Sequence, residues 1–513
     1  MAQPALHRAH SAHSARRSPA AEGYRRRRPE DTALFRCVER HWPAFREQAE
    51  EQGGLPKFVV KEVEEYLRCG ILEHGCLRLA CCRCGFERLV GFSCKRRGFC
   101  PSCLGRRMTD SALHLVERVL PEVPLRQWVC SLPWRLRYLC GYDRKLCADV
   151  IGAFVNEVMR SLRRRAKRVF GLGSVAEAHT GAVCFVQRFD SALRLNVHGH
   201  VLSLDGVYLQ MDDGALGFRA LPAPTTAEVA NVARRTALKV RKVLLRHGRS
   251  LEGLFEGASD ASEDQPDDFA ERQPALAACY GAALQGVGLF GERAGQPTLR
   301  LLRPELERAG EPVAEVMGFN VHAGLALDGH DRKRVERVCR YLGRPPIAQD
   351  RLRQLDNGRL RYTMKKPWKD GTVALDFEPL DLIARLCAMV PAPGFHMIRY
   401  YGLFSSHAKL RSEVVPDPPD DAPAPPPQQL HLFEDNDELR LVRKPWAWLV
   451  RHVFLEDVTV CPKCSGAMRW LEVATKPDDI ARLLARQGLA PPPSPRPRAP
   501  PIGQLMLPFR PAG

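Results

Sequence analysis

The sequence predicts an α+β protein in which a cysteine-rich zinc unit precedes the main domain. Three observations support this prediction. The region from about 110 to 411 alternates helical patterns with β-like runs. A compact block at about 34–109 concentrates cysteines in Cys-x2-Cys pairs. The chain has 513 residues, which is more than one typical core requires, so several domains are expected.

The main region is predicted from the periodicity of its apolar residues. Runs of apolar and β-branched residues, typical of strands, occupy 181–189, 195–204 and 316–327. The segment 225–248 has the pattern of an amphipathic helix that begins after a threonine N-cap and ends at a glycine. An acidic stretch at about 256–274 interrupts the region and indicates a loop or insertion.

The remaining segments are predicted to be tails, a linker and a small unit. Residues 1–33 form a basic tail and residues 491–513 a proline-rich tail, and we expect both to be disordered. A proline-rich linker covers about 412–439, and a small unit with one Cys-x2-Cys pair follows at about 440–490.

The charge of the chain favours a polyanionic partner. Lys and Arg number 77 against 59 Asp and Glu, a net charge of +18. The excess is concentrated at 25–28, 95–97 and 160–168. Nucleic acid is the commonest partner of such a protein, whereas the alternative is that the excess only increases solubility.

The chain has the features of a cytoplasmic, nucleoid-associated protein. The N-terminus lacks the apolar segment of a signal peptide. No apolar run approaches the ~18 residues that a membrane helix needs. We therefore expect no membrane association and a reducing compartment, where paired cysteines more often bind metal than each other.

The cysteine block predicts a structural zinc site. Cys81-x2-Cys84 and Cys100-x2-Cys103 are separated by fifteen residues, a spacing that suits a tetrahedral four-thiolate site. Cys82 and Cys94 are two further thiols, either of which could replace a ligand. Such a closed site stabilises a fold and leaves no position for catalysis. Basic residues around the pairs are predicted to contact DNA phosphates, or alternatively to form a solvated basic face: Lys95, Arg96, Arg97, Arg106 and Arg107.

A second metal site is suggested near the C-terminus. Cys461-x2-Cys464 has no second pair beside it in the sequence. It is either half of a site that is completed from elsewhere or a tight turn with two idle thiols.

Two histidines one residue apart indicate a second kind of site. In a strand, His198 and His200 share a face at about 6.5 to 7 Å spacing and can converge on one ion. Gln187 lies eleven residues upstream, and a hairpin between would bring it beside them. Two imidazoles and an amide oxygen leave coordination positions open and suit Mn²⁺ or Mg²⁺. On spacing alone, two surface histidines on an edge strand remain an equal alternative.

Several motifs resemble one family. The stretch around His198 looks like the HUH motif of rolling-circle endonucleases. From about 60 to 490 the chain is similar to insertion-sequence transposases that move by rolling-circle replication and carry an N-terminal zinc-binding domain. The matching residues are "FSCKRRGFCPSC", "RQWVCSLPWRLRYL" (126–139), "QRFDSALRLNVHGHVLSLDGVY", "CRYLGRPP" (339–346), "KKPWKDGT" (365–372) and "CPKCSGAMR". Gly199 departs from the family pattern, whose middle residue is usually bulky, apolar and packed behind the sheet.

The resemblance implies a fold and a nucleophile. The fold would be an HUH-type antiparallel sheet with helices on one face. Tyr341 matches the family's catalytic tyrosine, which attacks a DNA phosphate to give a 5′-phosphotyrosine and a free 3′-OH. The sequence itself predicts a helix there, because an apolar stripe leads to the stop at Pro345 and Pro346 and leaves Tyr341 off it. The stripe comprises Val335, Val338, Cys339 and Leu342.

Other residues refine this interpretation. Some relatives carry a second tyrosine four residues on, where this chain has Pro345, so one tyrosine is expected unless another enters the site from Tyr362, Tyr400 or Tyr401. Lys365 and Lys366 could hold the leaving strand or form an ordinary basic edge. His322 is interpreted as a packing residue and only a reserve ligand. No phosphate-binding loop is present, in agreement with chemistry that needs no ATP.

The sequence thus favours a transposase, a metal-dependent endonuclease and strand transferase acting on single-stranded or hairpin element ends. One alternative is a hydrolytic metalloenzyme with further ligands on later strands. The other is a zinc-dependent DNA-binding protein without activity, or a decayed transposase.

Overall fold

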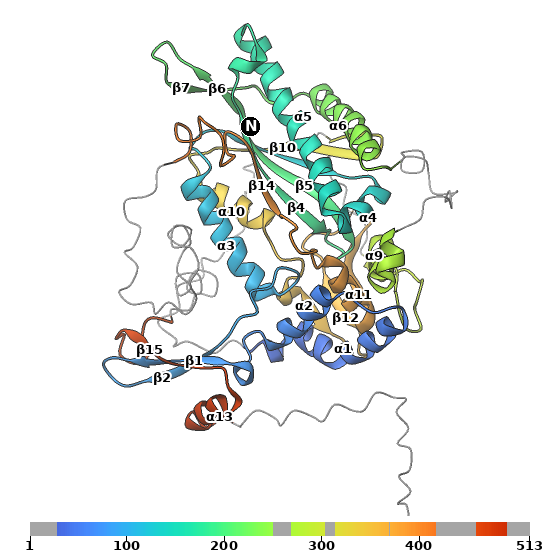
Figure 1. Cartoon of the computed structure of the whole chain (residues 1–513), viewed down its shortest axis with the longest axis vertical. Helices are drawn as coiled ribbons and strands as arrows, with labels where there is room; N and C mark the ends of the chain where they lie inside the picture. The colour runs from blue at the N-terminus through green and yellow to red at the C-terminus, as the bar shows by residue number, and fades with distance from the viewer. Residues whose placement is uncertain (1–27, 250–267, 303–312, 369, 417–457, 490–513) are drawn as a thin grey trace, which may run out of the picture. The chain divides into compact units, whose positions relative to one another are not determined.

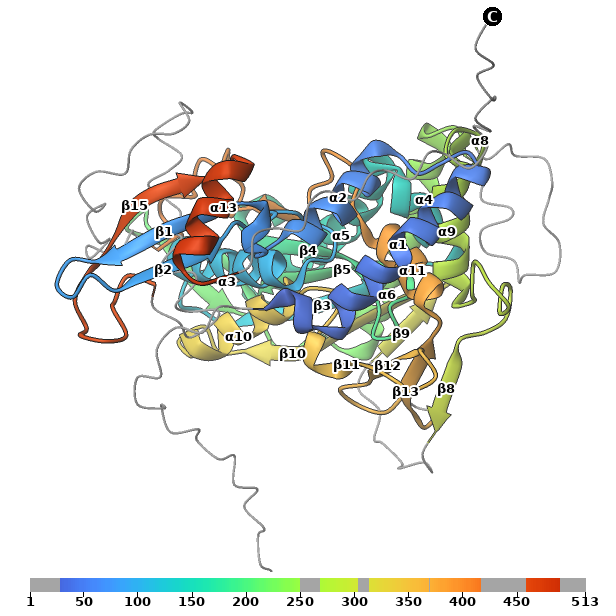
Figure 2. The ribbon, with the colours of Figure 1, turned by 90° about the horizontal axis from the view of Figure 1, so that it is seen from below.

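The computed structural model describes residues 28–249, 268–302, 313–368, 370–416 and 458–489 (Figures 1 and 2). These residues form two compact units. The small unit combines residues 70–92 with 458–489, and the large unit contains the other described residues. The predicted zinc-binding segment, 34–109, is therefore divided between the two units. Most of the predicted N-terminal tail, linker and acidic insertion, and all of the predicted C-terminal tail, lie outside the described residues. The last residues of the predicted N-terminal tail are described, and Pro29–Asp31 form a short 3-10 helix there.

A six-stranded antiparallel sheet forms the centre of the large unit. Its strand order is β14-β4-β5-β3-β10-β9. The strands are β3 (Leu125–Ser131), β4 (Gly181–Phe189), β5 (Leu195–Leu204), β9 (Val313–Val316), β10 (Phe319–Leu327) and β14 (Ile398–Gly402). The predicted strands 181–189 and 195–204 coincide with β4 and β5. The predicted run 316–327 begins at the last residue of β9 and continues through a tight turn at Met317 and Gly318, both with positive φ, into β10.

Helices cover both faces of this sheet. One face packs against α5 (Arg144–Phe170), and α6 (Thr226–Arg246) packs against α5. The other face, with Leu202 and Leu204, shares an apolar core with α3 (Pro101–Arg118) and α10 (Arg332–Leu342), which lie side by side in Figure 1. The α+β class is confirmed, but the expectation of helices on one face is too narrow. The helix predicted at 225–248 is α6, with a capping box at Thr225.

The other described elements of the large unit are a second sheet, a hairpin and further helices. A four-stranded sheet has the order β11-β12-β13-β8, and β6 and β7 form a hairpin. The strands of this second sheet are β8 (Leu299–Leu302), β11 (Leu352–Gln354), β12 (Leu360–Thr363) and β13 (Thr372–Phe377). The hairpin comprises β6 (Gly206–Gln210) and β7 (Leu216–Ala220). The helices are α1 (Ala33–Glu51), α2 (Lys57–Arg68), α4 (Trp134–Tyr142), α8 (Asp268–Arg272), α9 (Pro274–Gln285) and α11 (Pro379–Met389).

The small unit is a three-stranded sheet with one helix. Strand β1 (Cys76–Cys81) lies between β2 (Glu87–Gly91) and β15 (Met468–Ala474), and α13 (Pro477–Arg486) packs over a small apolar core. The unit therefore combines a hairpin from the first hundred residues with a segment close to the end of the chain. Within the described residues, no helix is long and apolar enough to span a membrane.

Candidate active site and cysteine clusters

The two histidines meet at their Nε2 atoms. Both side chains point to the face of β5 that α10 covers, and both are buried, with 8% and 6% exposure. Nε2 of His198 lies 3.0 Å from Nε2 of His200. Two ligands at about 2.1 Å from an ion and at a right angle would also be about 3.0 Å apart. The pair therefore has the spacing of two adjacent octahedral ligands.

Neighbouring groups fix the orientation of each ring. Nδ1 of His198 lies 2.8 Å from the carbonyl oxygen of Asn196, so Nδ1–H donates there and Nε2 keeps its lone pair. Nδ1 of His200 lies 3.0 Å from the carboxamide of Gln127. A glutamine amide can present either its nitrogen or its oxygen, so it accommodates either tautomer of His200. Such outer partners orient the ligands of metal sites.

Burial keeps both rings neutral. Burial is the main cause that lowers the pKa of His198 to about 4, and the hydrogen bond to Asn196 only partly offsets it. Burial also lowers the pKa of His200 well below its ordinary value, with added repulsion from His198 and Arg344. Neutral imidazoles are the form that binds a cation. Both rings therefore have, at neutral pH, the protonation state that a metal ligand needs.

Gln187 supplies the third candidate ligand. It lies directly opposite His198 across the β4–β5 hairpin, as the sequence predicts. Its Nε2 donates to the carbonyl oxygen of Leu342 at 2.8 Å. Its Oε1 is buried and has no hydrogen-bond partner among the described residues. A buried oxygen without a donor is costly, and a cation held by the histidines would satisfy it.

Tyr341 lies beside the histidines. It occupies the last turn of α10, whose Val335, Cys339 and Leu342 are buried, and its own side chain is 45% exposed. The ring centroids of Tyr341 and His200 are 6.5 Å apart, with the ring planes at 80°. The bond from Gln187 to Leu342 links the strand with the candidate ligand to the helix with the tyrosine. The site and the tyrosine are therefore held together.

Arg344 is a site residue that sequence reasoning missed. Its guanidinium carbon lies 4.2 Å from the centroid of the Tyr341 ring and 5.7 Å from that of Phe189. Nη1 of Arg344 is buried without a hydrogen-bond partner in the described part of the chain. A guanidinium with an unused donor beside a candidate nucleophile suits a phosphate. The sequence places it three residues after Tyr341, within the motif "CRYLGRPP" (339–346).

Helix α5 occupies the space behind the histidines. A Cβ built on Gly199 would lie 3.2 Å from Cδ1 of Ile151 and 3.7 Å from Sγ of Cys184. Ile151 therefore supplies the apolar bulk that the middle residue supplies in the family pattern. The glycine is therefore matched to this helix.

Gly199→Val should destabilise the protein by about 1–3 kcal/mol, because its methyl groups would overlap Ile151 in a filled core. Urea unfolding measures the change. The double variant Gly199→Val/Ile151→Ala should recover part of the loss, since it vacates the overlapped volume. A single variant as stable as the wild type would contradict this packing.

The other candidate residues are placed as follows. Lys365 and Lys366 are exposed in the loop between β12 and β13. In that loop, Nε1 of Trp368 donates to Oγ of Ser191 at 2.9 Å, which ties it to the β4–β5 turn. His322 lies two strands from His200 in the same register row, and Val129 is between them.

The other tyrosines are in different surroundings. The hydroxyl of Tyr362 accepts a hydrogen bond from Arg351 at 2.6 Å. Tyr400 and Tyr401 lie on the edge strand β14, and the hydroxyl of Tyr401 approaches α5 behind the sheet. Within the described residues, the tyrosine whose ring contacts His200 is Tyr341.

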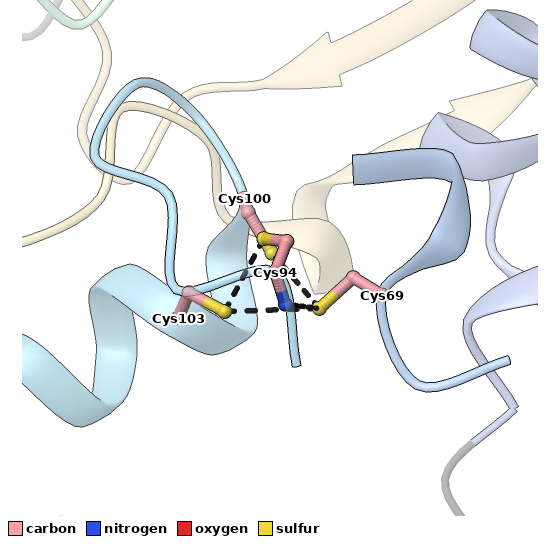
Figure 3. Close-up of side chains that lie close together, drawn as sticks. All are labelled: Cys69, Cys94, Cys100 and Cys103. Atoms are coloured by element: carbon pink, nitrogen blue, oxygen red, sulfur yellow. Dashed lines mark hydrogen bonds between the residues drawn. The ribbon is translucent and has the colours of Figure 1, made fainter. Parts of the chain in front are cut away.

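The cysteines form two clusters instead of the predicted one. Sγ atoms of Cys69, Cys94, Cys100 and Cys103 lie within 4.8 Å of one another (Figure 3). Cys81 and Cys84 cluster instead with Cys461 and Cys464. The predicted site of Cys81, Cys84, Cys100 and Cys103 is therefore wrong as a single set. The reason is the β1–β2 hairpin of the small unit, because Cys81 and Cys84 lie at its tip, whereas Cys69 and Cys94 come before and after it in the chain and belong to the large unit.

The first cluster joins the end of α2 to the start of α3. Cys69 follows α2, Cys100 is the N-cap of α3, and Cys103 lies in its first turn. Sγ of Cys103 is 3.4 Å from that of Cys94 and 3.7 Å from that of Cys69. Four convergent thiols are typical of a closed structural zinc site. The sequence indicates Cys94 as a possible replacement ligand. Cys69 is not part of a Cys-x2-Cys pair, so the spacing of the cysteines does not identify it as a ligand.

The predicted DNA-binding residues near this cluster make internal contacts. Arg106 donates to Sγ of Cys103 at 3.4 Å, and Arg97 donates to the carbonyl oxygen of Phe395 at 3.0 Å. Arg96 pairs with Glu65, and Arg107 donates to the carbonyl oxygen of Lys95, whose own side chain is exposed. These contacts give most of the group a structural role, and DNA contact by Lys95, Arg96, Arg97, Arg106 and Arg107 stays a prediction.

Comparisons with known proteins find similarity to transposases. A family model described as "Putative transposase" matches residues 181–411, and one described as "Transposase zinc-binding domain" matches residues 37–132. The chain is also similar to the transposase for insertion sequence element IS801 of Pseudomonas savastanoi pv. phaseolicola. The two are 24% identical over 373 residues, which cover 69% of this chain and 72% of the relative. No solved structure matches.

Proposed function

Because the chain belongs to the insertion-sequence transposases with a zinc-binding domain, we propose that it nicks single-stranded DNA through Tyr341. Its activity as a transposase makes it a DNA endonuclease and strand transferase, and DNA is its partner. The proposal adds a one-tyrosine mechanism with a divalent cation held by His198, His200 and Gln187. It further places the reaction at single-stranded or hairpin element ends.

One observation supports the proposal above the others. Two buried, neutral imidazoles have Nε2 atoms 3.0 Å apart, and the ring of His200 lies edge-on to the half-exposed ring of Tyr341. The unsatisfied Oε1 of Gln187 opposite His198 completes a donor set of two nitrogens and one oxygen, which fits Mg²⁺ or Mn²⁺. A site that only bound DNA would not need buried, unsatisfied ligand atoms.

The proposed reaction is a transesterification. The phenolic oxygen of Tyr341 attacks phosphorus and releases its proton. The bond to the 3′ oxygen breaks, and that oxygen takes up a proton to give a free 3′-OH beside a 5′-phosphotyrosine. One phosphodiester replaces another, so the step needs no ATP. A bound cation would polarise the scissile phosphate and offset the charge that develops on it.

Two groups of basic residues fit supporting roles. Arg344 stacks on the Tyr341 ring and can position a non-bridging phosphate oxygen through its unused Nη1 donor. Lys365 and Lys366 lie in a loop that is hydrogen-bonded through Trp368 to the β4–β5 turn. This turn leads into β5, the strand with His198 and His200. We propose that they hold the displaced strand. A cytoplasmic, nucleoid-associated location follows from this role as a further proposal.

Covalent trapping tests the proposal. The full chain is incubated with Mn²⁺ and labelled single-stranded oligonucleotides made from the DNA that flanks its gene. A denaturant-stable adduct should form, should require the divalent cation, and should map by mass spectrometry to the peptide with Tyr341. Binding without an adduct would favour the zinc-dependent DNA-binding alternative. An adduct on another tyrosine would overturn the assignment of the nucleophile.

A further inference from the structure

We propose that Cys81, Cys84, Cys461 and Cys464 bind a second zinc ion that fastens the C-terminal segment 458–489 onto the β1–β2 hairpin. This proposal is independent of the nucleophile and of the catalytic cation. The family match for the zinc-binding domain ends at residue 132, so Cys461 and Cys464 lie outside it. The site therefore joins two parts of the chain that are separated by more than three hundred residues.

The four sulfur atoms have the spacing of a tetrahedral zinc site. Sγ of Cys81 lies 3.4 Å from Sγ of Cys464, and Sγ of Cys84 lies 3.6 Å from Sγ of Cys461. All four atoms are within 4.8 Å of one another. Zinc–sulfur bonds of about 2.3 Å place tetrahedral sulfur atoms about 3.8 Å apart, whereas a disulfide brings them to about 2.05 Å. The arrangement therefore fits a shared ion.

The two Cys-x2-Cys turns direct backbone N–H groups at their sulfur atoms. N–H of Arg83 donates to Sγ of Cys81 at 3.3 Å. N–H of Lys463 donates to Sγ of Cys461 at 3.4 Å in the second turn. Hydrogen bonds to sulfur favour the thiolate, which is the form that binds zinc. Two turns from distant parts of the chain thus offer equivalent ligand sets.

The residue after each pair adopts the same uncommon conformation. Gly85 has φ of 69° and Ser465 has φ of 55°, both in the left-handed region. Each turn is then closed by N–H of its first cysteine, which donates to Phe86 or Gly466 at 2.8 Å. A serine in this region is disfavoured and persists only where the surroundings require it. Ser465 and Gly85 thus share the same left-handed backbone conformation, as expected if both turns bind one ion.

Besides the β1–β15 ladder and the ion pairs Arg78–Glu472 and Arg486–Glu87, the small unit has only a small apolar core to hold its pieces together. Its apolar core is formed by a few residues of the 3-10 helix η2 (Leu72–His74) and of β1, β2, β15 and α13, among them Leu72, Leu89 and Leu483. On β15, Trp470, Leu471 and Val473 are exposed, so the strand buries little apolar area against its neighbours. Units of this size usually need a metal or disulfides for stability. Zinc binding would add to the free energy that holds segment 458–489 on the β1–β2 hairpin.

Zinc content tests the proposal. The untagged full chain is purified in a His198→Ala/His200→Ala background, so that the candidate catalytic site adds no zinc. We expect two zinc ions per chain, and one after Cys461→Ser/Cys464→Ser. Cys82→Ser is the matched control, because this exposed thiol lies inside the Cys81–Cys84 turn but outside the cluster; it should leave two. A single zinc ion with all cysteines present would overturn the proposal, and that measurement needs no cysteine variant to fold.

Chain cleavage tests the fastening. A protease site is inserted between residues 417 and 457 of the full chain, and the folded protein is cut. The C-terminal fragment should stay bound in zinc and dissociate when a strong chelator is added. A fragment that stays bound in chelator, or leaves in zinc, would show that the ion does not fasten the segment.

Discussion

Tyr341→Phe is expected to abolish the covalent adduct with DNA and to lower the rate of strand cleavage by at least about 10³-fold. The change removes one oxygen atom and leaves the ring that contacts His200 and Arg344. Because this side chain is 45% exposed at the end of α10, the fold should be unaffected. The measurement is the rate of adduct formation on labelled single-stranded DNA, with the melting temperature of each variant as a check on folding.

Tyr400→Phe is the matched control for that experiment. Tyr400 is 37% exposed, close to the value for Tyr341, and it lies on β14 at the edge of the same sheet. It should form the adduct at the wild-type rate. Equal adduct formation by Tyr341→Phe and Tyr400→Phe would show that the nucleophile is a different residue. Loss in both would indicate that the assay reports general damage to the sheet edge.

The parts of the site that lie close together in sequence could be predicted. The alternation of β5 places His198 and His200 on one face, and the short β4–β5 connection brings Gln187 opposite His198. The helix with Tyr341 follows from its apolar stripe and from the prolines after it. Each of these inferences needs only local periodicity and one turn. Local patterns determine such geometry because strand and helix periods are fixed.

Contacts between distant segments could not be predicted. Gln127 reaches His200 because β3 pairs with β5, and nothing in the sequence identifies that pairing. The predicted cysteine grouping was wrong for the same reason, since Cys84 lies at the tip of a hairpin and Cys100 lies beyond the end of that hairpin, and Cys69 has no neighbouring cysteine in the sequence. Which thiols share an ion depends on the fold and not on spacing alone. Only the unpaired Cys461-x2-Cys464 indicated that a partner pair lay elsewhere.

His200→Ala should reduce the affinity for Mn²⁺ by at least about 100-fold and lower metal-dependent cleavage in proportion. The variant removes one of the two Nε2 atoms that are 3.0 Å apart and leaves His198 and Gln187 as an incomplete set. Gln127→Leu should have a smaller effect, about 10- to 100-fold, because Gln127 orients the ring of His200 but does not itself face the ion. Calorimetric titration with Mn²⁺, beside adduct rates at saturating Mn²⁺, separates lost binding from lost chemistry.

His322→Ala distinguishes a ligand site from a general histidine surface. His322 shares a register row with His200, but Val129 on β3 lies between them, so its ring should not reach the same ion. The variant should bind Mn²⁺ as the wild type does. If His322→Ala lost as much affinity as His200→Ala, the cation would be held farther across the sheet than the geometry of His198 and Gln187 implies. The order His200→Ala, Gln127→Leu, His322→Ala therefore tests the position of the ion, because only a cation between the two Nε2 atoms gives losses that decrease in this sequence.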